Sequence, residues 1–170
     1  LARVKVQLKI KSLQDKLKQS NQMLLELSHT DPLTGLNNRR SMMDALDKEF
    51  ERSTRKNSPL SLLMLDIDHF KAINDRFGHE TGDTVLEAVG EFLAEHVGDA
   101  HEDALVARWG GEEFLILLHD TTVENLSNVA KDVLHTVEAL PPIVVEGKAL
   151  TVSVGASYAP SAPWIQTFEQ

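Results

Sequence analysis

Acidic side chains are the groups in this sequence whose types and spacing could support chemistry. Asp66 and Asp68 lie at the exit of the apolar run Leu60–Ile67, and Glu112 and Glu113 follow two glycines that separate two further apolar runs. If these runs form neighbouring strands, their carboxylates meet at one end of a sheet. Mg²⁺ binds hard oxygen ligands, usually one or two carboxylates together with the phosphates of a substrate. The pattern therefore predicts a metal site and metal-assisted phosphoryl chemistry.

Simpler roles remain open for several of these carboxylates. Asp68 or Asp75 would also serve as the N-cap of a short helix, and Glu113 as a surface charge on a hairpin. Asp83 follows in the loop and helix after Asp75 and completes the acidic group. An EF-hand calcium loop beginning at Asp66 does not fit, because the glycine and the glutamate required at its sixth and twelfth positions are missing. Taken together, the carboxylates favour the metal site.

Helices and strands must alternate along the chain to position these groups. Apolar residues at helical spacing predict a helix from Asn38 that ends before Pro59, and further helices at 70–77, 85–93 and 126–137. A capping box at Thr121–Glu124 begins the last of these helices. Strands are predicted at Leu60–Ile67, Ala104–Arg108, Phe114–Leu118, Ile143–Glu146 and 152–158, the last two joined by a turn at Gly147-Lys148.

The connections between these elements define the fold class. Gly110 and Gly111 join two antiparallel strands, and we expect them to supply the positive backbone dihedrals of a tight hairpin. Residues 78–82 contain two glycines and are expected to form a loop. The prediction is an α/β fold with a mixed central sheet flanked by helices and preceded by an N-terminal helical stalk.

The stalk is predicted over residues 1–28, where apolar residues recur at alternating spacings of three and four. The seam consists of Ile10, Leu13, Leu17, Ser20, Leu24 and Leu27. Such a heptad pattern favours a coiled coil that brings two copies of the chain together, although a helix that packs on its own domain remains open. The second domain is expected over residues 29–170.

Composition excludes several classes of function. The net charge is −9, and residues 1–28 hold six basic and two acidic residues, so the remaining domain is strongly acidic. We expect no nucleic-acid partner, because an acidic surface repels phosphate backbones. The sequence holds no cysteine and no apolar run as long as a membrane helix, so we expect a cytoplasmic piece of a longer polypeptide with no membrane segment.

Five segments together resemble the GGDEF family of diguanylate cyclases, in its GGEEF form. The most specific is Arg108-Trp109-Gly110-Gly111-Glu112-Glu113-Phe114, and the others appear in the family's order at 31–40, 66–75, 78–83 and 152–155. The resemblance runs from about Ser28 to Tyr158. Leu1–Ile10 is more loosely similar to the last helix of a receiver domain, which implies a response regulator.

The resemblance implies the condensation of two GTP into cyclic di-GMP and two pyrophosphates by a homodimer. It implies that Asp66, the backbone carbonyl of Ile67 and Glu112 hold Mg²⁺, with Mn²⁺ as an alternative. Glu113 would help to position the metal or the attacking 3′-hydroxyl. The implied substrate-binding residues are Asn74 and Asp83 at the guanine base, Phe70 and Lys71 at the terminal phosphates, and Gly110 and Gly111 in the hairpin.

The sequence departs from the family after Tyr158. The family continues into a helix with a lysine and an arginine that contact phosphates, and residues 159–170 contain neither. This indicates a catalytic domain that is incomplete at its C-terminus. The alternative function is a catalytically inactive GGDEF domain that binds a nucleotide or a protein partner without turnover.

Overall fold

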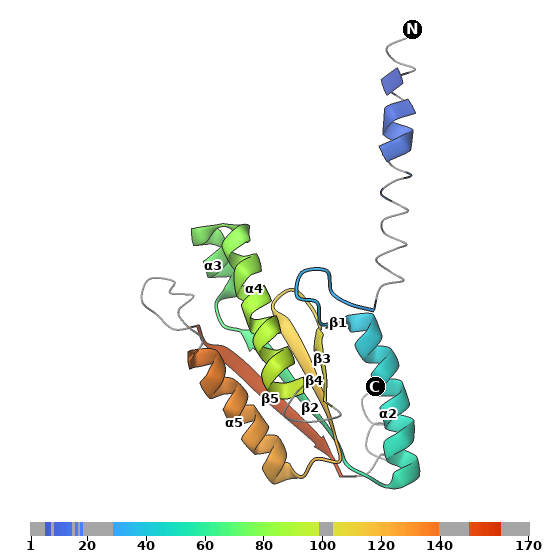
Figure 1. Cartoon of the computed structure of the whole chain (residues 1–170), viewed down its shortest axis with the longest axis vertical. Coiled ribbons are helices and arrows are strands. Elements are labelled where there is room, and N and C mark those ends of the chain that lie inside the picture. The colour runs from blue at the N-terminus through green and yellow to red at the C-terminus, as the bar shows by residue number, and fades with distance from the viewer. Residues whose placement is uncertain are drawn as a thin grey trace, which may run out of the picture.

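The computed structural model describes residues 6–7, 9–14, 16, 18, 29–98, 104–139 and 150–160 (Figure 1). The strand predicted at Ile143–Glu146, the turn that follows it and the C-terminal residues 161–170 lie outside the described residues. So do four of the six positions of the heptad seam, from Leu17 to Leu27.

The described chain contains one sheet with the strand order β1-β3-β4-β2-β5. β2 (Leu60–Ile67) lies between β4 (Glu113–His119) and β5 (Val152–Ala159) and is antiparallel to both. β3 (Leu105–Arg108) is antiparallel to β4, and the short β1 (Asn37–Asn38) is parallel to β3. The predicted mixed sheet is confirmed, and β2 has the bounds that the sequence predicts.

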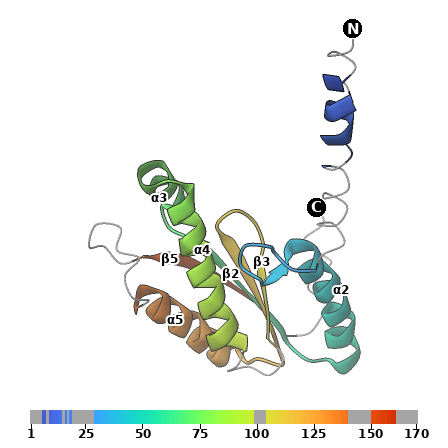
Figure 2. The same cartoon turned by 45° about the horizontal axis from the view of Figure 1, so that its top comes forward.

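Helices cover both faces of the sheet. α2 (Arg39–Lys56) lies on one face, and α4 (His79–Leu93) and α5 (Val123–Ala139) lie on the other (Figures 1 and 2). α3 (Phe70–Phe77) follows the end of β2, and a π-helical turn, η1 (Ala94–Gly98), extends α4. The predicted α/β architecture with flanking helices is therefore confirmed.

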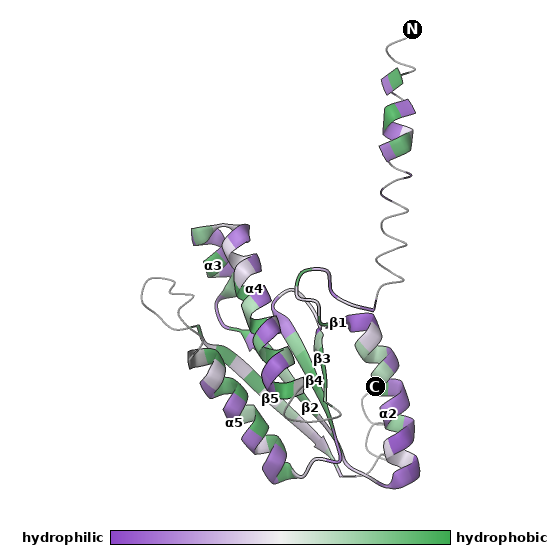
Figure 3. Ribbon diagram, viewed as in Figure 1, coloured by the Kyte–Doolittle hydropathy of each residue, from purple (hydrophilic) through white to green (hydrophobic). Residues whose placement is uncertain are grey.

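The alternation of side chains along β2 divides the core in two. Leu63 and Leu65 are fully buried in the larger cluster beneath α4 and α5, whereas Leu62 and Met64 pack toward Met42 of α2. Successive residues of a strand point to opposite faces, so a strand covered on both sides needs a nearly continuous apolar sequence. Figure 3 shows that the inner strands are mostly hydrophobic, whereas the helices that cover them carry both hydrophobic and hydrophilic residues.

Polar caps fix the ends of two helices. The side chain of Asn38 accepts a hydrogen bond from Ser41 N at 2.9 Å and begins α2. The capping box predicted at Thr121–Glu124 is wrong by one residue. Thr122 Oγ1 accepts from Asn125 N at 3.2 Å, whereas Thr121 Oγ1 donates to the carbonyl of His119 and is occupied there.

The loop predicted at residues 78–82 is also wrong, because α4 begins at His79 directly after Gly78. Gly78 alone turns the chain, with a φ of 87° that favours glycine. The hydroxyl of Thr81 donates to the carbonyl of Phe77 at 3.0 Å and helps to hold the first turn. Gly82 is consequently a buried helical residue, and Asp83 lies in the first turns of α4.

The described residues between 6 and 18 are helical and exposed. Val6, Ile10 and Leu13 leave 57%, 46% and 54% of their surface accessible, and Ile10 and Leu13 are the two described positions of the predicted seam. The stalk as a dimer contact stays a prediction. Within the described ranges, no helix combines the length and the apolar character needed to span a membrane.

Candidate active site

The ends of β2 and β4 bring the predicted metal-binding residues together. Asp66 is directly opposite Glu113 in the antiparallel register, and Ile67 N donates to the carbonyl of Glu112 at 3.3 Å. Opposed side chains of neighbouring strands lie about 4.5–5.5 Å apart at their Cβ atoms, and like charges in such a pair destabilise a sheet. Among the described residues, neither carboxylate of this pair forms an ion pair with lysine or arginine. A cation bound between them would remove the repulsion, so the donor set fits a hard divalent metal.

The carboxylates do not form a complete metal cage. Within the described part of the chain, no three His, Asp or Glu side chains gather as a metal-binding group. Mg²⁺ usually takes only one or two carboxylates from the protein and the rest of its ligands from substrate and water, and the metal site stays a prediction.

The hairpin between β3 and β4 is closed by hydrogen bonds from Trp109 N and Gly110 N to the carbonyl of Glu113, at 2.8 and 3.3 Å. The expected positive dihedrals at Gly110 and Gly111 are wrong, since neither residue has its φ in the left-handed region. Gly110 instead leaves space beside Glu113. A Cβ at this position would lie 2.8 Å from Oε2 of Glu113, so the missing side chain leaves room for that carboxylate.

Arg108 joins this hairpin to the loop that precedes β1. Its Nε and Nη2 donate to the carbonyl of Gly111 at 3.2 and 2.8 Å, and its Nη1 contacts Oδ1 of Asp31 at 3.2 Å. Asp31 also accepts hydrogen bonds from the amide and the hydroxyl of Thr34, both at 2.9 Å. The planar guanidinium makes both connections at once, which a lysine ammonium cannot reproduce. Neither charge was assigned a role from the sequence, because their separation along the chain carries no periodic signal.

The environment of Asp31 makes this connection dependent on pH. Partial burial raises the pKa of Asp31, but the hydrogen bonds from Thr34 and the nearby charge of Arg108 outweigh burial and hold the pKa below its usual value. A carboxyl with a lowered folded-state pKa stabilises the fold above its unfolded pKa of about 3.9. This contribution is lost as the pH falls through the lower, folded-state value.

Replacing Asp31 by asparagine is therefore expected to lower the free energy of unfolding by about 1–2 kcal/mol at pH 7, since a charge-assisted hydrogen bond to Arg108 is lost. The difference from the wild type should shrink below about pH 4 as Asp31 itself becomes protonated. Denaturant unfolding at several pH values measures both effects. Asp47→Asn, on the exposed side of α2, is the matched control. A difference that stays constant from pH 7 to pH 3 would contradict the assignment.

Asp68 is not the N-cap that was considered for the short helix. Ser153 Oγ donates to Oδ1 of Asp68 at 2.7 Å, and this bond together with one from Thr151 holds the pKa of Asp68 below its usual value. The N-cap of α3 is His69, and no side chain caps that end. Asp68 therefore links the residues that follow β2 to the start of β5 through these hydrogen bonds.

Four of the predicted substrate-binding residues lie on α3 and α4, and the other two, Gly110 and Gly111, lie in the β3–β4 hairpin. Lys71 and Asp83 are exposed, and Asn74 is half-buried. Phe70 is buried in the core, so a contact between this residue and phosphate would come from its backbone N–H. The first N–H groups of a helix have no partner within the helix and favour anions. Figures 1 and 2 show the α3–α4 pair and the β3–β4 hairpin at the same end of the sheet.

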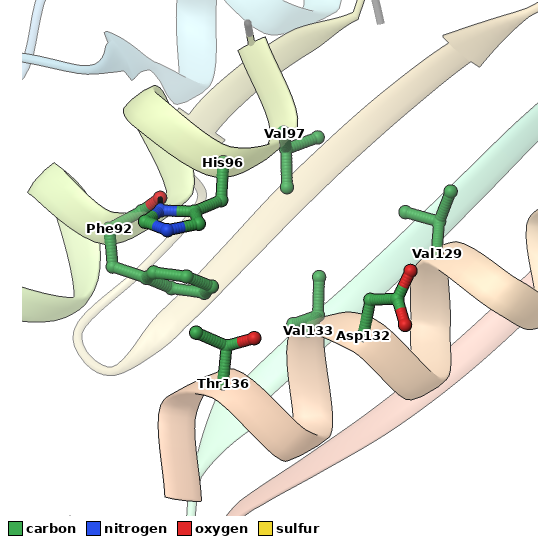
Figure 4. Close-up of a pocket in the computed structure, with 7 residues that line it drawn as sticks. All are labelled: Phe92, His96, Val97, Val129, Asp132, Val133 and Thr136. Carbon is green, nitrogen blue, oxygen red and sulfur yellow. Dashed lines mark hydrogen bonds between the residues drawn. The ribbon is translucent and has the colours of Figure 1, made fainter. Parts of the chain in front are cut away.

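A separate hollow of about 200 Å³ lies between η1 and α5 (Figure 4). Its apolar lining residues are Phe92, Val97, Val129 and Val133. The polar lining residues are His96, Asp132 and Thr136. The ring of His96 lies 4.4 Å from that of Phe92, centroid to centroid. None of the predicted site residues lines this hollow, so it is not part of the candidate active site.

The fold and the arrangement of the hairpin define a GGDEF domain. Residues 28–166 match the family described as "Diguanylate cyclase, GGDEF domain", and the chain belongs to this family. The response regulator PleD from Caulobacter vibrioides is 40% identical over 159 residues, which cover 92% of this chain and 34% of PleD. The chain thus spans about a third of the length of this relative.

Two solved structures share the fold. The active GGEEF domain of a diguanylate cyclase from Vibrio cholerae is 35% identical with a TM-score of 0.62, over 72% of this chain and 76% of that one. The coiled coil and GGDEF domain of DgcB from Caulobacter crescentus, in complex with c-di-GMP, is 26% identical with a TM-score of 0.70. That match covers 92% of this chain and 83% of the DgcB chain. Diguanylate cyclases of this family are generally metal-dependent.

Proposed function

We propose that this chain is a diguanylate cyclase that condenses two GTP into cyclic di-GMP and two pyrophosphates. The observation that carries the proposal is the pair of opposed carboxylates, Asp66 and Glu113, at the strand ends where Glu112 also lies. In each half of the reaction, the 3′-hydroxyl oxygen of one GTP forms a bond to the α-phosphorus of the other. The bond from that phosphorus to pyrophosphate breaks, and the hydroxyl loses its proton.

In this proposal, Asp66, the backbone carbonyl of Ile67 and Glu112 hold the metal, and Glu113 orients the attacking hydroxyl. The metal is Mg²⁺, with Mn²⁺ as an alternative, and when bound it neutralises charge on the phosphates and on the leaving pyrophosphate. β2 is paired on both sides, so the backbone that carries Asp66 is held in place before substrate arrives. Such preorganisation is the main contribution that a protein can make to phosphoryl transfer.

The base and the phosphates are bound by the helical side of the site. The carboxylate of Asp83 accepts hydrogen bonds from the N1–H and amino groups of guanine, and the Asn74 amide binds a further polar atom of the base. Adenine has no donor at N1 and no amino group at C2, so its binding would leave these protein groups unpaired. Lys71 and the backbone N–H of Phe70 bind the terminal phosphates. Gly110 and Gly111 let the hairpin approach the substrate closely.

The proposal includes a homodimer, because each domain brings one of the two GTP molecules. The exposed seam residues Ile10 and Leu13 support a contact through the stalk. Since GTP is the substrate, we place the reaction in the cytoplasm and include no nucleic-acid partner. A response regulator as the parent protein, implied by the resemblance of Leu1–Ile10, stays a prediction.

Incubation of the purified chain with GTP and Mg²⁺ is expected to give a product with the mass of cyclic di-GMP. Chelation with EDTA should abolish the product, and added Mg²⁺ should restore it, because the facing carboxylates need a cation to bind phosphates. Mass spectrometry of the reaction mixture provides the measurement. A folded chain that binds GTP but forms no cyclic dinucleotide would favour the alternative, a GGDEF domain that only binds its ligand.

A further inference from the structure

Gly82 is packed directly against the side-chain amide of Asn74. The two residues lie on α4 and α3, which meet at Gly78, where Gly78 N donates to the carbonyl of Asn74 at 3.0 Å. A Cβ built on Gly82 would overlap Oδ1 of Asn74, lie 2.9 Å from its Cγ and lie 3.2 Å from Cζ of Phe70. No side chain larger than hydrogen fits here while Asn74 keeps its position.

Asn74 gains no hydrogen bond from this arrangement. Its Oδ1 is buried and has no partner among the described residues. Buried polar atoms without partners are rare and lower stability, so such a group in a folded protein calls for an explanation other than stability. The two polar atoms of an amide diverge from Cγ. With Oδ1 against Gly82, Nδ2 is turned away from Gly82 and presented as a donor.

We propose that Gly82 is a positioning residue for recognition of the guanine base. Its missing side chain leaves the space that Oδ1 of Asn74 occupies, so that Nδ2 faces away from Gly82 and donates to an acceptor on the base. The adjoining residue, Asp83, accepts from the donors of the base. This inference rests on the proposed function, in which Asn74 and Asp83 bind guanine. It adds that the space at Gly82, rather than a hydrogen bond within the protein, admits the Asn74 amide in this orientation.

Gly82→Ala is expected to weaken GTP binding about tenfold, the effect of one misplaced hydrogen bond to a ligand. Binding of inorganic triphosphate, which has no base, should not change. Titration calorimetry of the whole chain with each compound in the presence of Mg²⁺ measures both affinities. Gly90→Ala is the matched control, because Gly90 is also buried in α4 but its Cβ would meet Thr34 at 2.9 Å. The control should lower the melting temperature and leave GTP affinity unchanged.

A double variant tests the contact independently of nucleotide binding. Alanine is favoured over glycine inside a helix, so a methyl group at position 82 should stabilise α4 once the amide is gone. We therefore expect Gly82→Ala to lower the melting temperature of the native chain but not that of Asn74→Ala. If Gly82→Ala alone fails to fold, the double variant should still fold.

Several results would overturn the inference. These are unchanged GTP affinity in Gly82→Ala, equal losses for GTP and triphosphate, and the same fall in melting temperature with and without Asn74. Failure of the double variant to fold would also overturn it, since Gly82 would then be needed for packing elsewhere. A wild-type chain that does not bind GTP would refute the proposed function instead, and the melting temperatures would still report on the contact.

Discussion

Replacing Glu112 by glutamine is expected to abolish synthesis of cyclic di-GMP, with a loss of about a hundredfold or more, while the protein stays folded. The substitution keeps the size of the side chain and removes a negative charge. A neutral amide is a poor ligand for Mg²⁺, and losing one group that stabilises developing charge typically costs two to three orders of magnitude in rate. The fold should survive, because the contact that Glu112 makes with Ile67 uses its backbone carbonyl.

Initial rates of product formation, with a melting curve for each protein, provide the test. Glu87→Gln, on the exposed side of α4, makes the same chemical change away from the candidate site and should leave both quantities unchanged. Full activity in purified Glu112→Gln would remove this residue from the proposed metal site. A large fall in the melting temperature, or the loss of the unfolding transition, would instead assign Glu112 a structural role.

Replacing both Leu17 and Leu24 by lysine is expected to convert a dimer into a monomer and to slow turnover strongly at low protein concentration. Four charges would be introduced into the seam of the proposed dimer, two from each chain, and uncompensated buried charges are strongly destabilising. The α/β domain should keep its fold, because none of the stalk residues that the structure describes belongs to its two core clusters.

Sedimentation velocity gives the oligomeric state, and specific activity measured over a range of protein concentrations shows whether turnover follows it. Ser12→Lys with Gln19→Lys adds the same charge at positions off the seam and should keep the dimer. An unchanged sedimentation coefficient in the seam variant would mean that the stalk is only a surface helix.

The sequence predicted those parts of the fold that depend on continuous local patterns. β2 was predicted with its bounds because its apolar run is preceded by Pro59 and is too short for a helix. α2 was predicted by its apolar spacing, and the structure adds the polar cap at Asn38. The acidic residues at the ends of β2 and β4 were correctly expected to meet, because neighbouring antiparallel strands place such ends together.

The parts that were missed depend on contacts between distant residues. α4 begins at His79, directly after the positive φ of Gly78, so that only one of the two glycines in 78–82 turns the chain, and Gly82 packs on Asn74 inside the helix. Gly110 was recognised as a hairpin residue, but it lacks the expected positive φ and leaves space beside Oε2 of Glu113. The connection from Arg108 to Asp31 joins residues 77 positions apart in the sequence and has no periodic signature.

The position of β2 inside the sheet also constrains the order in which the domain is completed. Its partners, β4 and β5, both follow it in the chain, and β5 is the last strand that the structure describes. While a ribosome makes the protein, Asp66 emerges early but cannot be held on both sides until Val152–Ala159 has been synthesised and has docked. Pairings of high sequence separation form slowly. β2, which carries the candidate metal ligand Asp66, is therefore without its β5 partner for much of synthesis. A nascent chain cannot complete this arrangement of strands before nearly the whole domain has left the exit tunnel.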